Sequence, residues 1–118
     1  MQLTMLHSKI HRARATGAKL HYNGSLGVDA ALLKKAGMLP GQQVDVLSVD
    51  NGTRLTTYLI EEEAGSKQFN IYGPAAHLIE KGHTIVIIAY AQMSEEEARS
   101  YKPTTLVMNE DNEIEREL

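Results

Sequence analysis

A serine hydroxyl that directly follows a glycine is the residue pair in this chain with the most reactive chemistry open to it. Ser25 follows Gly24 in the segment Tyr22-Asn23-Gly24-Ser25. A hydroxyl in this position can attack the preceding carbonyl and form an ester, because glycine has no side chain to block the approach and tolerates a strained backbone. Elimination and hydrolysis would then break the chain and leave a pyruvoyl group. Gly65-Ser66 repeats the dipeptide as a simple turn, so Ser25 needs further context.

Arg54 and Tyr58 are a second candidate pair, four residues apart. On an extended strand, side chains at this spacing point the same way. A guanidinium can hold a carboxylate through two hydrogen bonds, and a phenol can deliver a proton. The spacing alone equally describes a solvated polar face.

Metal and thiol chemistry find little support in the sequence. His7 and His11 have a spacing that suits metal ligands, but no nearby carboxylate completes a site. We therefore interpret them as surface or hydrogen-bonded imidazoles and expect no metal. The chain has no cysteine, which excludes a thiolate nucleophile, a disulfide framework and a cysteine-ligated zinc.

The length and charge of the chain limit its domain count and its partners. With 118 residues, 42% of them hydrophobic, residues 1–118 predict one globular domain with one core. The longest apolar run, Ile85 to Ala91, is too short to span a bilayer, and the start lacks a signal-peptide pattern, so we expect a cytoplasmic protein with no membrane partner. Residues 1–28 hold four basic and no acidic residues but only one aromatic. This segment suits a small anionic substrate, and we expect no nucleic-acid partner.

The elements that must position these residues are mostly strands. Leu3 to Thr16 predicts one long strand or two short ones, and Asp29 and Gly37 bound a short helix over Ala30–Ala36. A second helix is expected from Pro74 to Lys81. The remaining expected strands are a hairpin of Val44–Val49 and Thr53–Ile60 around Asp50-Asn51-Gly52, Gln68–Tyr72, the central strand Ile85–Ala91, and Thr104–Met108.

The end of the chain and an internal echo complete this interpretation. Ser94-Glu95-Glu96-Glu97 has the spacing of a capping box, and the acidic residues 109–118 predict a frayed tail. Ala30-Ala31-x-Leu33 followed by Gly37 matches Ala75-Ala76-x-Leu78 followed by Gly82, which sets Val44 and Val46 against Ile85 and Ile87. Two such copies in a β-rich chain suggest a pseudo-symmetric barrel, whereas a doubly wound parallel sheet is disfavoured.

Several motifs together resemble the aspartate 1-decarboxylase family over residues 1–103. They are Met5-Leu-x-x-Lys9-Ile-His11-Arg12-Ala, Leu20-His-Tyr22-x-Gly24-Ser25, Asn51-Gly-x-Arg54-x-x-Thr57-Tyr58, and Gly73-x-Ala75-Ala76-His77 with Gly82. The resemblance implies a mainly β fold, a small double-psi β-barrel with short helices, assembled as a homotetramer. It also implies self-cleavage between Gly24 and Ser25 into residues 1–24 and 25–118, and leaves open whether a maturation partner assists this cleavage. The implied activity is decarboxylation of L-aspartate to β-alanine and CO2 for pantothenate biosynthesis.

The same resemblance implies roles for individual residues. Ser25 would become the pyruvoyl cofactor, whose ketone is an electron sink that no ordinary side chain supplies. Tyr58 would return a proton to the substrate, and Thr57 would hydrogen-bond the Gly24 carbonyl during self-cleavage and border the substrate. The other implied residues are Lys9 and Arg54 on the substrate carboxylates, Gly73 and Ala75 beside the substrate, and His11, Tyr22 and Tyr72 in support.

Two positions depart from the family pattern, and one rival function stays open. Tyr72 stands where the family usually has Asn, and Leu47 where it often has Trp. The first departure puts the polar geometry of the pocket wall in doubt, with consequences for maturation or for substrate fit. A decarboxylase of altered specificity, for instance towards glutamate, is a separate alternative. The rival is a non-catalytic β-barrel interaction or DNA-binding module, suggested by the basic first segment.

Overall fold

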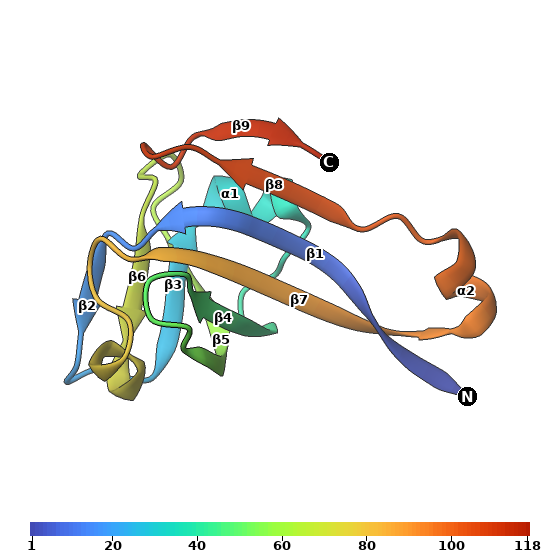
Figure 1. Cartoon of the computed structure of the whole chain (residues 1–118), viewed down its shortest axis with the longest axis horizontal. Helices are drawn as coiled ribbons and strands as arrows, with labels where there is room; N and C mark the ends of the chain where they lie inside the picture. The colour runs from blue at the N-terminus through green and yellow to red at the C-terminus, as the bar shows by residue number, and fades with distance from the viewer.

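The strands of the chain hydrogen-bond in one continuous series. The computed structural model describes all of residues 1–118, and the strand order is β2-β6-β3-β5-β4-β7-β1-β8-β9 (Figure 1). The series has two end strands, β2 and β9, and does not close on itself. The nine strands and the short helices confirm the predicted mainly β class. The elements are β1 Gln2–Arg14, β2 Gly17–Lys19, β3 Ser25–Asp29, α1 Ala30–Ala36, β4 Gln43–Ser48, β5 Arg54–Glu62, β6 Phe69–Tyr72, the 3-10 helix η1 Gly73–His77, β7 Thr84–Ser94, α2 Glu95–Ser100, β8 Thr104–Met108 and β9 Ile114–Glu117.

The longest strands, β1 and β7, form an antiparallel ribbon. The first strand is one element rather than two, but it carries register shifts between Leu6 and Ser8 and between His11 and Ala13. These bulges let one long strand bend along the molecule. Strand β7 lies between β1 and β4, which confirms the prediction of a central strand. In Figure 1 the far ends of β1 and β7 run out together toward α2.

Helix α1 has the predicted bounds because both of its ends are coded locally. The Asp29 carboxylate accepts a hydrogen bond from Ala31 N at 2.8 Å, and Gly37 ends the helix in the left-handed conformation with φ 73°. Asp29 also accepts from Gly65 N at 3.0 Å and Lys67 N at 2.8 Å. Burial raises the pKa of Asp29, but these backbone N–H groups outweigh it and hold the pKa below its ordinary value. One buried carboxylate therefore fastens α1 to the loop after β5.

The hairpin of β4 and β5 also forms as predicted, around the turn that contains Asn51 and Gly52. Val46 pairs with Leu55 on β5 and with Ile87 on β7. The two strands that echo each other in the sequence therefore lie side by side in the sheet. On its other edge β5, which carries Thr57 and Tyr58, pairs with β3, where Leu26 lies opposite Leu59.

The second predicted helix is shorter than expected. Pro74 begins a helical segment, but the structure has a 3-10 helix over Gly73–His77, not a helix to Lys81. No side chain caps its first turn, and Ile79 is completely buried. The chain turns inward to bury Ile79, and this tertiary contact ends the helix. By contrast, the capping box at Ser94 forms, and its hydroxyl accepts from Glu97 N at 3.1 Å.

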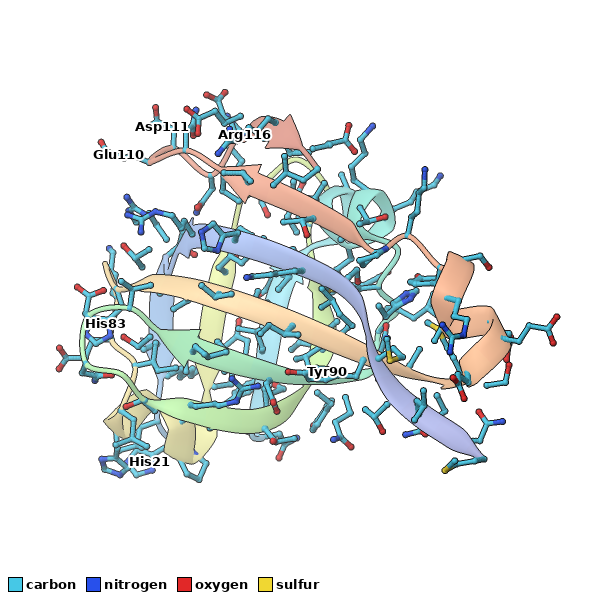
Figure 2. The ribbon with its side chains drawn as sticks, turned by 45° about the vertical axis from the view of Figure 1, so that its right-hand side comes forward. His21, His83, Tyr90, Glu110, Asp111 and Arg116 are labelled. Atoms are coloured by element: carbon cyan, nitrogen blue, oxygen red, sulfur yellow. The ribbon has the colours of Figure 1, made fainter.

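The acidic C-terminus is folded, although its composition predicts fraying. Ile114–Glu117 forms β9 antiparallel to β8, and Figure 2 shows Glu110 and Asp111 at the turn near Arg116. The reason lies in Asn112, which is buried with φ 56°. Its side chain accepts from Arg14 N at 2.7 Å and donates to the carbonyls of Arg14 and Lys67. Three hydrogen bonds across the chain thus hold this turn against the body of the protein.

The core lies between the strands and α1. The largest completely buried side chains are Phe69, Ile10, Leu26, Leu33, Leu59, Ile71, Ile79, Ile85, Ile87 and Leu106.

No helix of the chain has both the length and the apolar character needed to cross a membrane.

Candidate functional site

Ser25 begins β3 and its side chain is directed back along the chain. The residue is 3% exposed, and its hydroxyl donates to Asn23 O at 3.1 Å. The Oγ atom therefore lies on the side of Ser25 from which Gly24 enters. Pairing of Ser25 with Tyr72 on β6 holds the backbone of the first strand residue in place. The dipeptide Gly24–Ser25 is thus the junction between a loop and the first residue of β3.

The backbone of Gly73 lies close to that of Gly24. A side chain at position 73 would place its Cβ 2.6 Å from Gly24 Cα and 2.9 Å from Gly24 N, closer than side-chain carbons approach other atoms. Gly73 also has φ 80°, a conformation that favours glycine. Gly73 is therefore the support on which the Gly24 backbone lies, and both its conformation and its contact exclude a larger residue.

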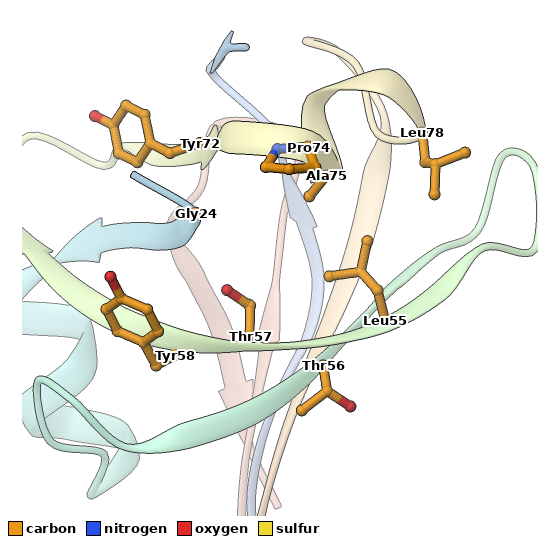
Figure 3. A pocket seen from close by; sticks show the side chains of 9 residues that line it. All are labelled: Gly24, Leu55, Thr56, Thr57, Tyr58, Tyr72, Pro74, Ala75 and Leu78. Atoms are coloured by element: carbon orange, nitrogen blue, oxygen red, sulfur yellow. The ribbon is translucent and has the colours of Figure 1, made fainter. Parts of the chain in front are cut away.

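A pocket of about 480 Å³ opens beside this junction. Figure 3 shows Tyr72 and Tyr58 on opposite sides of Gly24, with Thr57 between Tyr58 and Leu55 on β5. The pocket brings together five of the residues that the sequence singled out. It is lined by Gly24, Leu55, Thr56, Thr57, Tyr58, Tyr72, Pro74, Ala75 and Leu78.

The strand β5 supplies the hydroxyl groups of the pocket. Alternation along the strand directs Thr57 toward the interior and leaves its neighbours Thr56 and Tyr58 exposed. Figure 3 accordingly shows Thr57 directed toward Gly24 and Thr56 directed away from it. Tyr58 is 43% exposed, so its phenol reaches both the pocket and solvent. The Thr57 hydroxyl and the Tyr58 phenol therefore lie in the same pocket wall as Gly24.

The two expected carboxylate-binding cations do not line this pocket. Arg54 donates to Asp45 Oδ2 at 3.1 Å and to Tyr90 Oη at 2.7 Å, on the exposed face of β4, β5 and β7. The hydrogen bond to Asp45, followed by the field of Tyr90, raises the pKa of Arg54. Lys9 lies on β1, where it pairs with Ile88 and with Thr105. Within one chain, the pocket wall has no charged side chain.

His11 is likewise outside the pocket. It lies on β1, and its Nδ1 atom is buried without a hydrogen-bond partner. Burial lowers the pKa of His11, and the positive charges of Lys9, Arg12 and Arg116 lower it further. The His11 imidazole is therefore held neutral. The His7 side chain is engaged elsewhere, since it hydrogen-bonds Gly37 O at 3.0 Å and Tyr101 Oη at 2.6 Å.

Tyr72 lines the other side of the pocket, and Tyr22, outside the lining, packs against it. Their ring centroids are 4.8 Å apart, and Lys19 Nζ lies 5.0 Å from the Tyr22 ring centroid. Tyr72 Oη donates to Glu62 Oε2 at 2.7 Å. Burial raises the pKa of Tyr72, and the bond to Glu62 raises it further. The phenol therefore stays protonated and bound to the carboxylate.

Glu62 is not among the residues that the sequence singled out. Glu62 and Asn70 meet because Gly27 leaves the intervening strand β3 without a side chain at that point. A lone glycine within an apolar strand, Leu26-Gly27-Val28, is a recognised sign of such a close approach. That signal was present in the sequence, but it does not say which side chains approach.

The chain matches the family model described as aspartate decarboxylase over residues 1–115. It belongs to the aspartate decarboxylase family. A Frankia casuarinae protein named aspartate 1-decarboxylase 1 is 53% identical over 112 residues, covering 95% of this chain and 73% of the relative. The aspartate 1-decarboxylase of Caulobacter vibrioides is 47% identical over 116 residues, with 98% of each chain covered. That of Clostridium beijerinckii is 47% identical over 114 residues, with 97% of this chain and 92% of the relative covered.

The aspartate decarboxylase match is not confined to one part of the site. Its span, residues 1–115, contains Lys9 on β1, the Gly24–Ser25 junction, and the pocket residues of β5 and η1. The family match therefore spans the two cations outside the pocket, Lys9 and Arg54, as well as the residues that line it.

Proposed function

We propose that this chain is a pyruvoyl-dependent aspartate 1-decarboxylase that converts L-aspartate to β-alanine and CO2 for pantothenate biosynthesis, in the cytoplasm. One observation carries the proposal: a chain that matches the family over residues 1–115 has its Gly24–Ser25 junction in the wall of a pocket with Thr57 and Tyr58. A non-catalytic binding module is not favoured, because the relatives that match nearly the whole chain are named as enzymes.

The first step is self-cleavage between Gly24 and Ser25. Ser25 Oγ attacks the Gly24 carbonyl carbon, the peptide C–N bond breaks, and the nitrogen takes up the hydroxyl proton, which leaves an ester. Loss of the Ser25 α-proton then expels the Gly24 carboxylate and leaves an unsaturated amine. Water replaces that nitrogen and releases ammonia. The products are residues 1–24 with a free carboxylate and residues 25–118 with an N-terminal pyruvoyl group.

The residues around the junction fit these needs. The Ser25 hydroxyl is buried and directed back toward Gly24, while Gly73 supports the Gly24 backbone. Thr57 lies on the pocket side of β5 and can donate to the carbonyl oxygen as negative charge develops there. Ala75 and Pro74 line the same wall without competing polar groups.

The pyruvoyl ketone supplies the electron sink that decarboxylation of an amino acid requires. Tyr58 is placed to deliver a proton to the substrate α-carbon, since its phenol lines the pocket and also meets solvent, from which it can be reprotonated. Tyr72 lines the opposite side of the pocket, with the Tyr22 ring packed against it.

Aspartate brings two carboxylates, and the pocket of a single chain has no cation to meet them. Lys9 and Arg54 lie on exposed or half-exposed strand faces outside it. We therefore propose a homotetramer in which a neighbouring copy presents these two side chains to the pocket. Arg54 would exchange its contact with Asp45 for the substrate carboxylate, a pairing of similar geometry.

Substitution of the nucleophile tests this proposal, and the chain provides its own control. Ser25→Ala is expected to abolish cleavage and β-alanine formation, whereas Ser66→Ala, at the second Gly-Ser dipeptide, leaves both unchanged. Cleavage is followed by mass spectrometry and β-alanine by chromatography. Cleavage of the wild-type chain only after addition of a cell extract would assign a maturation partner. Decarboxylation by Ser25→Ala would exclude the pyruvoyl mechanism.

A further inference from the structure

Two side chains from different strands cross over β3 at Gly27. Glu62 on β5 and Tyr72 on β6 flank this strand from opposite sides, since β3 lies between β5 and β6. A Cβ at position 27 would overlap the Glu62 carboxylate and would lie 2.9 Å from Tyr72 Cε2. Glycine at this position opens the gap through which Glu62 reaches Tyr72, and a larger residue would displace the Glu62 side chain.

The contact is a hydrogen-bonded network rather than a single bond. Glu62 Oε2 accepts from Tyr72 Oη at 2.7 Å and from Asn70 Nδ2 at 2.6 Å. Asn70 is itself held, because its Oδ1 accepts from Thr16 Oγ1 at 2.8 Å. Bonds to a charged acceptor are stronger than neutral ones, and this one fixes the outer end of the Tyr72 ring.

The face of the Tyr72 ring is constrained as well as its hydroxyl end. The Tyr22 ring lies against it at 4.8 Å between centroids. A ring held at its hydroxyl and on its face has few alternative rotamers. Tyr72 therefore presents a fixed aromatic surface to the pocket, directly beside Gly24 (Figure 3).

We propose that Glu62 is a positioning residue that holds Tyr72 as a rigid end wall and so sets the length of the acidic amino acid that the pocket accepts. This inference rests on the proposed function. The phenol is committed to Glu62, so it limits the substrate by its ring and not by a hydrogen bond. With the ring fixed, the extra methylene that distinguishes glutamate from aspartate is expected to meet it. Exclusion of one methylene by a pocket is worth about 10- to 200-fold in kcat/KM.

Four variants test this role, with rates normalised to the cleaved fraction measured by mass. Glu62→Ala is expected to raise the KM for aspartate about fivefold, leave kcat within about twofold, and lower discrimination against glutamate about tenfold. Tyr72→Phe should likewise raise the KM and lower the discrimination while kcat stays within about twofold, and the double variant should be no worse than Glu62→Ala. Glu62→Gln keeps an acceptor oxygen but loses the charge, so its values should lie between those of Glu62→Ala and the wild type. Glu63→Gln, an exposed carboxylate one residue further on, is the matched control.

The contrary outcomes are equally defined. Wild-type discrimination in Glu62→Ala, additive effects in the double variant, or the same loss in Glu63→Gln would overturn the inference. If Glu62→Ala does not fold or cleave, Tyr72→Phe decides, and unchanged discrimination in that variant refutes the role. A wild-type chain that forms no β-alanine contradicts the proposed function itself, whereas an active wild type with an unaffected Glu62→Ala contradicts only this inference.

Discussion

Substitution of Gly73 by alanine separates the two tasks of this glycine. The left-handed backbone conformation costs a non-glycine residue about 1 to 2 kcal/mol. In addition, the new Cβ would lie 2.6 Å from Gly24 Cα, so the two backbones must separate by about 1 Å to reach an ordinary carbon contact. Overpacking of this kind adds about 1 to 3 kcal/mol.

Gly41 supplies the matched control for backbone strain. It has φ 84°, close to the 80° of Gly73, but nothing lies within 4 Å of a Cβ placed there. Gly41→Ala should therefore lose only the conformational part, about 1 to 2 kcal/mol, and should cleave at the wild-type rate. Gly73→Ala should lose about 2 to 5 kcal/mol and should also move the scissile residue. A misplacement of about 1 Å can slow a reaction about 100-fold.

Two assays measure these effects independently. Unfolding free energies are obtained from urea denaturation with both glycine variants in the Ser25→Ala background, so that every chain stays whole. Cleavage rates come from mass spectrometry of the variants with Ser25 intact. If folded Gly73→Ala cleaves as fast as Gly41→Ala, the close approach of Gly73 to Gly24 has no part in self-cleavage, and the reasoning is refuted.

Three further predictions concern single side chains. Asp29→Asn should lower the free energy of unfolding by about 2 kcal/mol at pH 7, while Asp111→Asn should have no effect. The folded pKa of Asp29 lies below its ordinary value of 3.8, so the difference in unfolding free energy should be constant above that pH and shrink as the pH falls further. Urea titrations at several pH values measure this difference. Tyr58→Phe should cleave normally but lower kcat about 100-fold or more, which an assay normalised to cleaved chains measures; an unchanged kcat would remove Tyr58 as the proton donor. Asn112→Ala should cost about 2 to 4 kcal/mol of unfolding free energy and speed hydrogen exchange in β9, and wild-type exchange there would contradict its anchoring role.

Elements whose ends are coded by neighbouring residues could be predicted from the sequence. Asp29 and Gly37 bound α1, Ser94 caps α2, and the Asn51-Gly52 turn joins β4 to β5. In each case the determining contact lies within a few residues, so the pattern and the structure coincide. The Gly24–Ser25 junction could be singled out for the same reason, because its chemistry depends on two adjacent residues.

Features that depend on distant partners could not be predicted. The acidic tail is held by Asn112 through Arg14, 98 residues away in the chain. The Tyr72 phenol is held by Glu62 through a gap that only the pairing of three strands creates. Composition predicts fraying in the first case. In the second, no local pattern links Glu62 to Tyr72, because their contact depends on the pairing of the strands.

The intact mass of the purified wild-type chain, followed over time, tests the central claim most directly. Self-processing predicts two species, residues 1–24 with a free carboxylate and residues 25–118 one ammonia lighter than the same fragment with an N-terminal serine. The larger species should appear together with the capacity to form β-alanine from aspartate. A chain that stays whole through prolonged warm incubation, with and without cell extract, and forms no β-alanine would contradict the account.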